Sequence, residues 1–198
     1  MRQFAPRATS AHHKSTPDVN SQKPCTLILM ATKARRPRLT RSDAIAEALG
    51  ALGCPGFAQL PLDFGIDERQ PAPDPAVVLI AALVCENLAP HVRSALPWLA
   101  LEYESIDWKW TVAEARRRNV QNRLGFIVTL AQHRAARAFG HDELLARLAE
   151  VEESLFEVRA EREDTLCQDD LPEAERTWLR SNRPREAAQW NILTDLAP

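Results

Sequence analysis

Residues 139–142 separate two long helical patterns of opposite charge. Residues 111–138 are rich in arginine, whereas residues 142–164 are rich in glutamate. Gly140 suits the position just past the end of a helix, and Asp142 suits the N-cap of the next one. Two helices joined by so short a connection pack side by side in opposite directions. The sequence therefore predicts a long antiparallel helical hairpin and an all-α fold.

Apolar residues recur at helical spacing in both halves of this hairpin. The first half carries Val120, Leu124, Ile127, Ala131, Ala135 and Ala138 on one face, and the second carries Leu144, Leu148, Val151, Leu155 and Val158. Steps of three and four residues produce a heptad-like seam on which another helix packs. The seam serves either the hairpin itself or a dimer, and the sequence leaves both open.

Residues 75–89 form the most apolar helical pattern of the chain. Asp74 and Pro75 supply an N-cap followed by a proline at the first helical position. The residues from Ala76 to Cys85 are apolar without interruption, which is typical of a helix surrounded by other helices. A buried strand is the alternative, but no second strand is evident to pair with it. We therefore expect residues 75–89 to be the central helix.

Shorter helices complete the predicted fold. Thr40 or Ser42 would cap a helix that runs to about residue 52 and ends at Gly53. Further helices are expected at residues 94–103, 172–180 and 184–196. The prediction is an all-α helical bundle of about five to seven helices, built around the apolar helix and the hairpin. It occupies a single domain of residues 39–198.

The first 38 residues are expected to be a disordered basic arm. Residues 1–41 contain nine Lys or Arg residues and one acid, whereas the rest of the chain contains 16 bases and 26 acids. Residues 1–29 mix Ser, Thr, Pro and Gln without a period, and Met30 begins a segment typical of a cytosolic start. We hypothesise that Met30 is the biological start and that residues 1–29 are not native. A transit peptide is the alternative interpretation.

The cysteines and apolar runs limit the class of protein. Cys25, Cys54, Cys85 and Cys167 lack the close spacing of a disulfide framework or a zinc finger, which indicates reduced thiols in the cytoplasm. No apolar run is long enough for a membrane span. The use of arginine rather than lysine after residue 29 indicates a GC-rich bacterial genome. We therefore expect a bacterial cytoplasmic protein without a membrane segment.

Residues 114–123 are the densest polar segment and carry the first candidate site. At about 100° per residue, Arg116, Arg123 and Arg134 fall in one stripe beside the apolar face of a continuous helix. Together with Asn119, these guanidinium groups would hold a phosphate or a carboxylate. The alternative is internal pairing with an acidic strip on the second helix, which comprises Glu150, Glu153, Glu157, Glu161 and Asp164.

Tryptophan and glycine supply two further signals near this segment. Trp108 and Trp110 are two residues apart and cannot share one face of a helix, so one of them is expected to be exposed. Tryptophan beside arginine is typical of a protein-binding hot spot, and a core anchor is the alternative. Gly125 lies inside the predicted helix at a cost of about 0.5–1 kcal/mol, which indicates close packing against a helix or a bound group.

The basic segment before the first helix is a candidate nucleic-acid interface, formed by Lys33, Arg35, Arg36, Arg38 and Arg41. Five bases in nine residues attract a nucleic-acid backbone without reading its sequence. The acidic remainder of the chain would repel DNA, and no helix-turn-helix pair is evident.

The sequence contains no motif for metal binding or catalysis. No Glu has a His three residues later, as carboxylate-bridged metal bundles require, and no HxxxH pair occurs. The chain also lacks GxSxG, a P-loop and GxGxxG. We therefore expect no metal and no cofactor.

The leading hypothesis for function is a non-catalytic intracellular protein that binds another macromolecule, as regulators, adaptors and antitoxins do. The expected partner is another protein. One alternative is a DNA-binding transcriptional regulator that uses the basic N-terminal arm. A second is an enzyme of unknown reaction that uses Arg116, Asn119 and Arg123. Self-association is open in each case.

Overall fold

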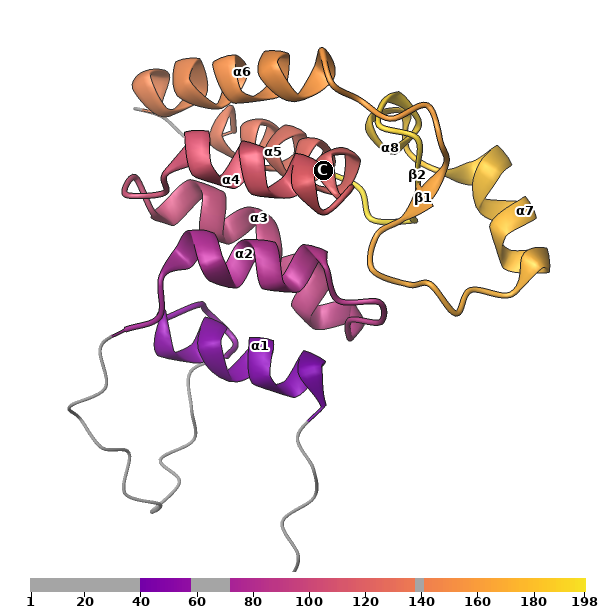
Figure 1. The fold of residues 1–198 in the computed structure, drawn as a ribbon, viewed down its shortest axis with the longest axis horizontal. Helices are drawn as coiled ribbons and strands as arrows, with labels where there is room; N and C mark the ends of the chain where they lie inside the picture. Colours follow the sequence, from indigo (N-terminus) through magenta and orange to yellow (C-terminus); the bar gives the residue numbers. More distant parts are fainter. Residues whose placement is uncertain (1–39, 58–71, 138–140) are drawn as a thin grey trace, which may run out of the picture. The chain divides into compact units, whose positions relative to one another are not determined.

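A computed structural model of the chain describes residues 40–57, 72–137 and 141–198. These residues form eight α-helices and one pair of two-residue strands (Figure 1). The helices are α1 (Arg41–Ala51), α2 (Pro75–Leu83), α3 (Pro90–Glu102), α4 (Trp108–Arg117), α5 (Gln121–Ala135), α6 (Asp142–Phe156), α7 (Glu173–Asn182) and α8 (Arg185–Gln189). The strands are β1 (Asp164–Thr165) and β2 (Ile192–Leu193). The expectation of a mainly α-helical fold is confirmed.

Several expectations from the sequence lie outside the described residues. They concern the basic arm of residues 1–38 with its start at Met30, the C-cap at Gly140, and Ala138 at the end of the apolar face. Of the candidate nucleic-acid residues, Arg41 alone lies in the described part of the chain, at the first position of α1.

Local capping residues begin α1 and α2 as the sequence predicts. The Thr40 hydroxyl accepts a hydrogen bond from the Asp43 amide (3.1 Å), and the Asp43 carboxylate accepts one from the Thr40 amide (2.9 Å). This reciprocal arrangement is a capping box, which satisfies two donors at the helix start. At α2, Asp74 Oδ1 accepts a hydrogen bond from the Ala76 amide (2.8 Å), and Pro75 is the first helical residue.

The expectation that residues 75–89 form one surrounded central helix is wrong in length and in burial. α2 ends at Leu83, and Pro90 begins α3. Six of the nine residues of α2 are buried, but Val77 is 51% exposed and Ala81 is also exposed, which leaves one side of the helix open. The apolar composition of a helix does not reveal how many of its sides are covered, because the neighbouring helices decide this.

The predicted continuous helix over residues 111–138 is broken into α4 and α5. Asn119, between them, has a left-handed backbone with φ of 58°, a conformation that asparagine tolerates better than most residues. Arg116 and Arg123 therefore lie on different helices. Every residue from 122 to 131 is buried, so that α5 takes the central place that the sequence assigned to residues 75–89.

α6 lies beside α5 (Figure 1). Thr129 Oγ1 donates a hydrogen bond to Glu152 Oε1 (2.6 Å), and Gln121 Nε2 donates one to the Val158 carbonyl (3.4 Å). Both helices bury apolar residues that the spacing singled out, including Leu124, Ile127, Leu148, Val151 and Leu155.

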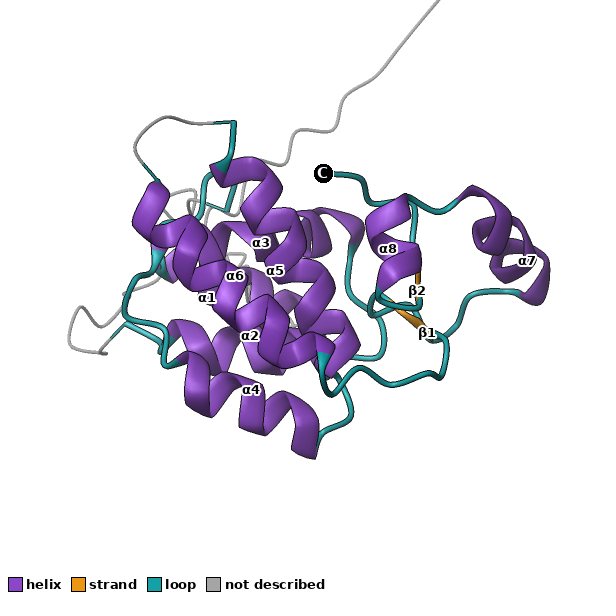
Figure 2. Cartoon of the chain, turned by 90° about the horizontal axis from the view of Figure 1, so that it is seen from above, coloured by secondary structure: helices purple, strands orange, loops and turns teal. Residues whose placement is uncertain are grey.

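The C-terminal elements gather on one side of the other helices, in the views of Figure 1 and Figure 2. β1 and β2 pair in parallel, with Thr165 opposite Leu193. The helix expected at residues 184–196 is therefore shorter than predicted, because α8 ends at Gln189 and β2 follows. Trp178 on α7 is 56% exposed.

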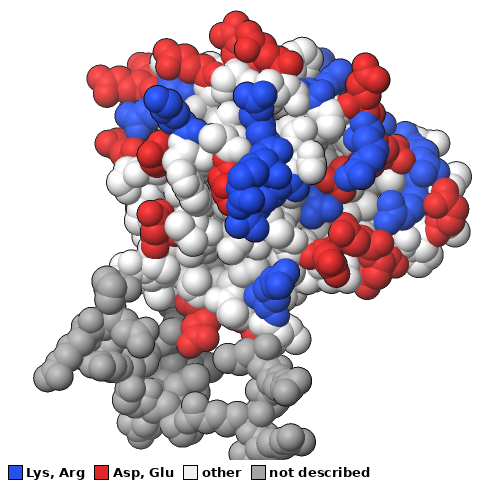
Figure 3. All heavy atoms as spheres, viewed as in Figure 1, with Lys and Arg blue, Asp and Glu red and all other residues white. Residues whose placement is uncertain are grey.

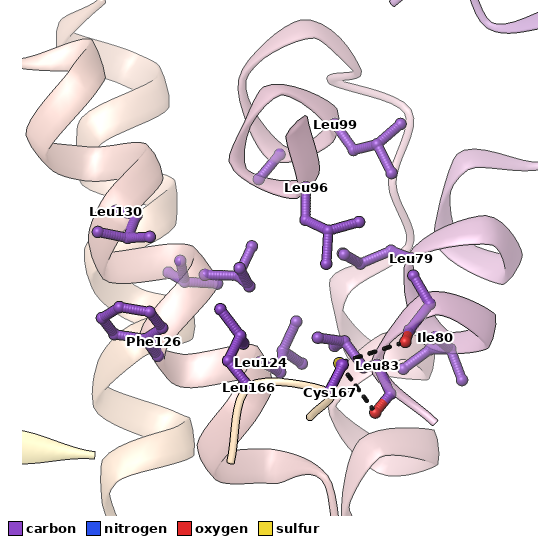
Figure 4. Close-up of a cluster of buried hydrophobic side chains, with 14 of the residues drawn as sticks. Leu79, Ile80, Leu83, Leu96, Leu99, Leu124, Phe126, Leu130, Leu166 and Cys167 are labelled. Atoms are coloured by element: carbon purple, nitrogen blue, oxygen red, sulfur yellow. Dashed lines mark hydrogen bonds between the residues drawn. The ribbon is translucent and has the colours of Figure 1, made fainter. Parts of the chain in front are cut away.

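The core lies between α2, α3, α5 and the segment after β1 (Figure 4). Its fully buried side chains include Leu79, Leu83, Leu96, Leu99, Leu124, Phe126, Leu130 and Leu166. The Cys167 thiol, drawn with these residues, donates toward the Ala82 carbonyl at 3.4 Å. Within the described ranges, no helix combines the length and the apolar character needed to cross a membrane.

Candidate functional site

An open groove lies between α1, α2 and α4. Its volume is about 490 Å³. Apolar side chains make up its floor, and they include Ile45 and Ala48 of α1, Val77 and Ala81 of α2, Val84 directly after α2, and Trp110 of α4. Trp110 is 41% exposed, so this residue and the half-exposed Val77 leave much apolar surface in contact with water at one place.

Helical spacing places these residues along one side of each helix. Val77 and Ala81 of α2 and Val84, the residue that caps its C-terminal end, are four and three residues apart and share a face. In α4, Trp110 is followed at four-residue intervals by groove residues 114 and 118. Three neighbouring helices therefore each contribute a strip of side chains to one shared depression.

Charged side chains border the apolar floor. Glu114 and Arg118 line the groove from α4, and Arg41 lines it from α1. Glu114 accepts hydrogen bonds from Arg117 Nη2 (2.6 Å) and Arg118 Nε (2.5 Å), which lower the pKa of Glu114 to about 2. Within the described residues, no acid lies within 4 Å of Arg41. The charged lining therefore consists of a paired Glu114 and Arg118 and of Arg41, which supplies one positive charge.

The distribution of charge sets this part of the molecule apart. Figure 3 shows fewer charged side chains over α2 than over α6 and α7. Elsewhere on the same face, acidic and basic side chains are interspersed, which is typical of a surface in contact with water.

The two tryptophans of the predicted hot spot lie in different environments. Trp110 lines the groove, whereas Trp108 is half-buried and faces α6 near Val112 and Val151. One of the pair is thus exposed, as their spacing predicts. The structure assigns Trp110 to the groove and Trp108 to the contact between α4 and α6.

The predicted arginine stripe is not one surface. Arg116 and Asn119 are exposed, Arg123 is buried, and Arg134 is half-buried with Nη2 3.3 Å from the Ser94 carbonyl. The break at Asn119 is the physical reason, because the helical wheel on which the stripe depends requires one continuous helix. The four residues therefore do not converge on a ligand.

Arg123 instead joins three elements of the fold. Its Nε and Nη2 donate to the two carboxylate oxygens of Asp164 (2.9 and 2.8 Å), and Nη2 also donates to Asp169 (2.9 Å). Nη1 donates to the carbonyl of Leu83 (2.9 Å), the last residue of α2. Burial disfavours the cation, but the hydrogen bonds and charges of Asp164 and Asp169 outweigh it and raise the pKa of Arg123. Internal pairing is thus observed for this arginine.

The thiol beside Arg123 is not in a reactive environment. Cys167 Sγ lies 3.9 Å from Arg123 Nη1 and is fully buried. Burial raises the pKa of Cys167 to about 12, so that the thiol stays protonated at neutral pH. A nucleophilic cysteine requires the opposite, namely an accessible thiolate. Among the described residues, no cluster of three His, Cys, Asp or Glu side chains has an arrangement suited to a metal ion.

The groove was not predicted from the sequence. The apolar run of residues 76–85 predicts a core helix, because such a run has the same composition whether its last side is covered or open. The spacing of Trp108 and Trp110 predicts that one of the two is exposed, but not which one. Comparison with protein-family models, with curated proteins and with solved structures found no match.

Proposed function

We propose that the protein is a non-catalytic binding module whose groove between α1, α2 and α4 holds an amphipathic helix of another protein. The observation that supports this most is the joint exposure of Val77 and Trp110 in one apolar depression. Burying apolar surface contributes about 25 cal/mol per Å², so a partner that covers the apolar surface of an open groove gains a favourable free energy of binding. Docking an apolar helix face into such a groove is a recurring mode of recognition.

The charges at the border select an acidic partner helix. Arg41 and Arg118 lie at the groove, and Arg118 is already paired with Glu114, whereas Arg41 has no acid within 4 Å among the described residues. Acidic residues that flank the apolar face of the incoming helix would meet these guanidinium groups. Charges of this kind set orientation and the rate of association more than affinity, so we expect association to slow as salt rises.

The proposal includes the arrangement of the helices. We infer that they form one bundle in which α5 and α6 make an antiparallel hairpin. The order of the contacts supports this, because Thr129 is joined to Glu152 and the earlier Gln121 to the later Val158.

A cytoplasmic site of action is part of the same proposal. Cys54, Cys85 and Cys167 are free and buried, which fits a reducing compartment. The two alternative functions have less support. The arm on which DNA binding depends lies outside the described residues, and Arg116, Asn119 and Arg123 do not gather around a site for catalysis.

The test is a binding comparison between two matched variants of the full chain. Val77→Glu places a charge on the groove floor, and Ala174→Glu places one on exposed α7. Affinity capture from native cells should yield a specific partner with wild-type protein and with Ala174→Glu, and should lose it with Val77→Glu. Circular dichroism checks that all three proteins are folded. Equal capture by all three would contradict the proposal.

Self-association is tested with the same proteins. Sedimentation velocity of the purified chain over a concentration series reports its oligomeric state. A dimer that Val77→Glu dissociates and Ala174→Glu preserves would assign the groove to a second copy, which would also contradict a heterologous partner.

A further inference from the structure

A second site lies away from the groove, around Arg93 in the first turn of α3. Arg93 is only 7% exposed. Its Nη1 donates to the Leu166 carbonyl (3.5 Å) and to the Gln168 side chain. Its Nε is buried and has no hydrogen-bond partner in the described part of the chain.

The charge of Arg93 lacks a direct counter-ion. Among residues 40–57, 72–137 and 141–198, no carboxylate lies within 4 Å of its guanidinium group. Arg123, the other buried arginine, is in contrast held by two aspartates. Arg93 hydrogen-bonds only neutral oxygens, and the charges of Asp195 and Glu175 act on it without direct contact. A buried cation without a carboxylate in contact is costly, because burial removes water without supplying an adjacent opposite charge. Such a group indicates that a ligand supplies the missing partner.

Arg93 lines a small pocket. The pocket has a volume of about 250 Å³ and lies between the first turn of α3, Leu166 and the C-terminal residues Thr194 and Asp195. This is room for a phosphate or a small carboxylate but not for a nucleotide, because ligand pockets of drug size begin at roughly 300 Å³.

Two further features make the surroundings of this pocket favourable to negative charge. α3 begins beside it with Pro90 in the pocket lining, and the N-terminal end of a helix carries a partial positive charge, although Pro90 has no N–H and the Val92 N–H already bonds to the Ala89 carbonyl. Arg134 also lies near, with Nη2 3.3 Å from the carbonyl of Ser94, which lines the pocket. Asp195 is the one acid of the lining, and it is exposed.

We propose that this pocket binds a small oxyanion, a phosphate or carboxylate group, which Arg93 holds at the N-terminal end of α3. Asp195 opposes the ligand from the C-terminal segment and weakens its binding. The site is independent of the groove, and its role holds whether or not a partner helix docks there.

Isothermal titration calorimetry of the full chain tests this site. Sodium phosphate and sodium acetate are titrated separately, at an ionic strength fixed with sodium chloride. We expect one binding site for at least one of the two anions, and the comparison identifies the preferred group. Asp195→Asn should tighten binding about threefold, because a nearby negative charge is removed. Arg93→Gln should weaken binding about tenfold or more, because a charge-assisted contact is lost.

The matched control is Arg116→Gln, which removes an exposed arginine from α4. It should leave the affinity unchanged within about twofold, since a screened distant charge contributes little. Absence of heat beyond the chloride control for both anions would overturn the proposal, as would equal weakening by Arg116→Gln and Arg93→Gln. If Arg93→Gln does not fold, Asp195→Asn decides: tighter binding supports the site, and unchanged or weaker binding overturns it.

Discussion

The indole ring of Trp190 occupies the space that a side chain at Gly125 would fill. A Cβ atom built on Gly125 would lie 2.3 Å from Cζ3 of Trp190. Trp190 is fully buried, and its Nε1 donates a hydrogen bond to Thr129 Oγ1 (2.8 Å). Through this hydrogen bond and its packing on Gly125, Trp190 holds the C-terminal segment against α5. This contact accounts for a glycine in the middle of a helix, where glycine costs about 0.5–1 kcal/mol relative to alanine.

Gly125→Ala is expected to lower the free energy of unfolding by about 1–3 kcal/mol. The added methyl group overlaps the indole, and overpacking outweighs the gain in helix propensity. Urea unfolding measures the loss. In a Trp190→Leu background, Gly125→Ala should lower the free energy of unfolding by less than about 0.5 kcal/mol, because the indole that the methyl group would overlap is absent. Equal losses in the two backgrounds would show that the ring is not the cause.

Arg123→Met is expected to destabilise the fold by about 3–5 kcal/mol. The change leaves Asp164 without its bidentate partner and removes the donor to the end of α2. Arg116→Met, at an exposed position of α4, should change the free energy of unfolding by less than about 0.5 kcal/mol. Thermal or urea unfolding of both variants checks this. A similar effect of the two substitutions would refute the structural role of Arg123.

Asn119 holds the break between α4 and α5 in a left-handed conformation. Asn119→Gly should be neutral within about 0.5 kcal/mol, because glycine adopts positive φ without a steric penalty. Asn119→Ala should destabilise by about 1 kcal/mol, because a Cβ without a local hydrogen-bonding group disfavours this conformation. The difference in melting temperature between the two variants measures the effect. An alanine variant at least as stable as the glycine variant would argue for a continuous helix.

Glu114 is expected to make stability depend on pH. Its pKa is about 2 in the folded state, below the ordinary value of 4.5. Pairing with Arg117 and Arg118 therefore stabilises the fold fully above about pH 4.5, and this contribution is lost as the pH falls toward 2. Compared with Glu114→Gln, wild-type protein should lose more stability between pH 5 and pH 3. An NMR titration that places the Glu114 carboxyl midpoint near 4.5 would contradict this.

Sequence reasoning succeeded where the cause of a structure is local. The Asp74–Pro75 start of α2 depends on neighbouring side chains, so the sequence predicts it directly. For α1 the sequence leaves Thr40 and Ser42 as alternative caps, and the structure has Thr40. The helical period also identifies the apolar faces of α5 and α6. The tight packing that Gly125 indicates is present, but the neighbour is Trp190, which lies 65 positions later in the chain and cannot be named from local pattern.

Sequence reasoning failed where distant contacts decide. A single left-handed residue, Asn119, divides a pattern that otherwise fits one helix. Arg123 is buried because Asp164 and Asp169 reach it from another segment, although arginine is usually found at surfaces. The groove could not be predicted because distant contacts decide whether an apolar residue is covered. Val77 would be a core residue if one more helix of this chain packed on it.

Photo-crosslinking from the floor of the groove tests the proposed function most directly. Benzoylphenylalanine replaces Val77 in one full-length variant and the exposed Ala174 of α7 in the matched control, and both are irradiated in native cells. We predict one discrete adduct from position 77, joined to an acidic amphipathic helix of a different protein, and no such adduct from position 174. No adduct from position 77, the same adducts from both positions, or an adduct only with a second copy of this chain would contradict the account.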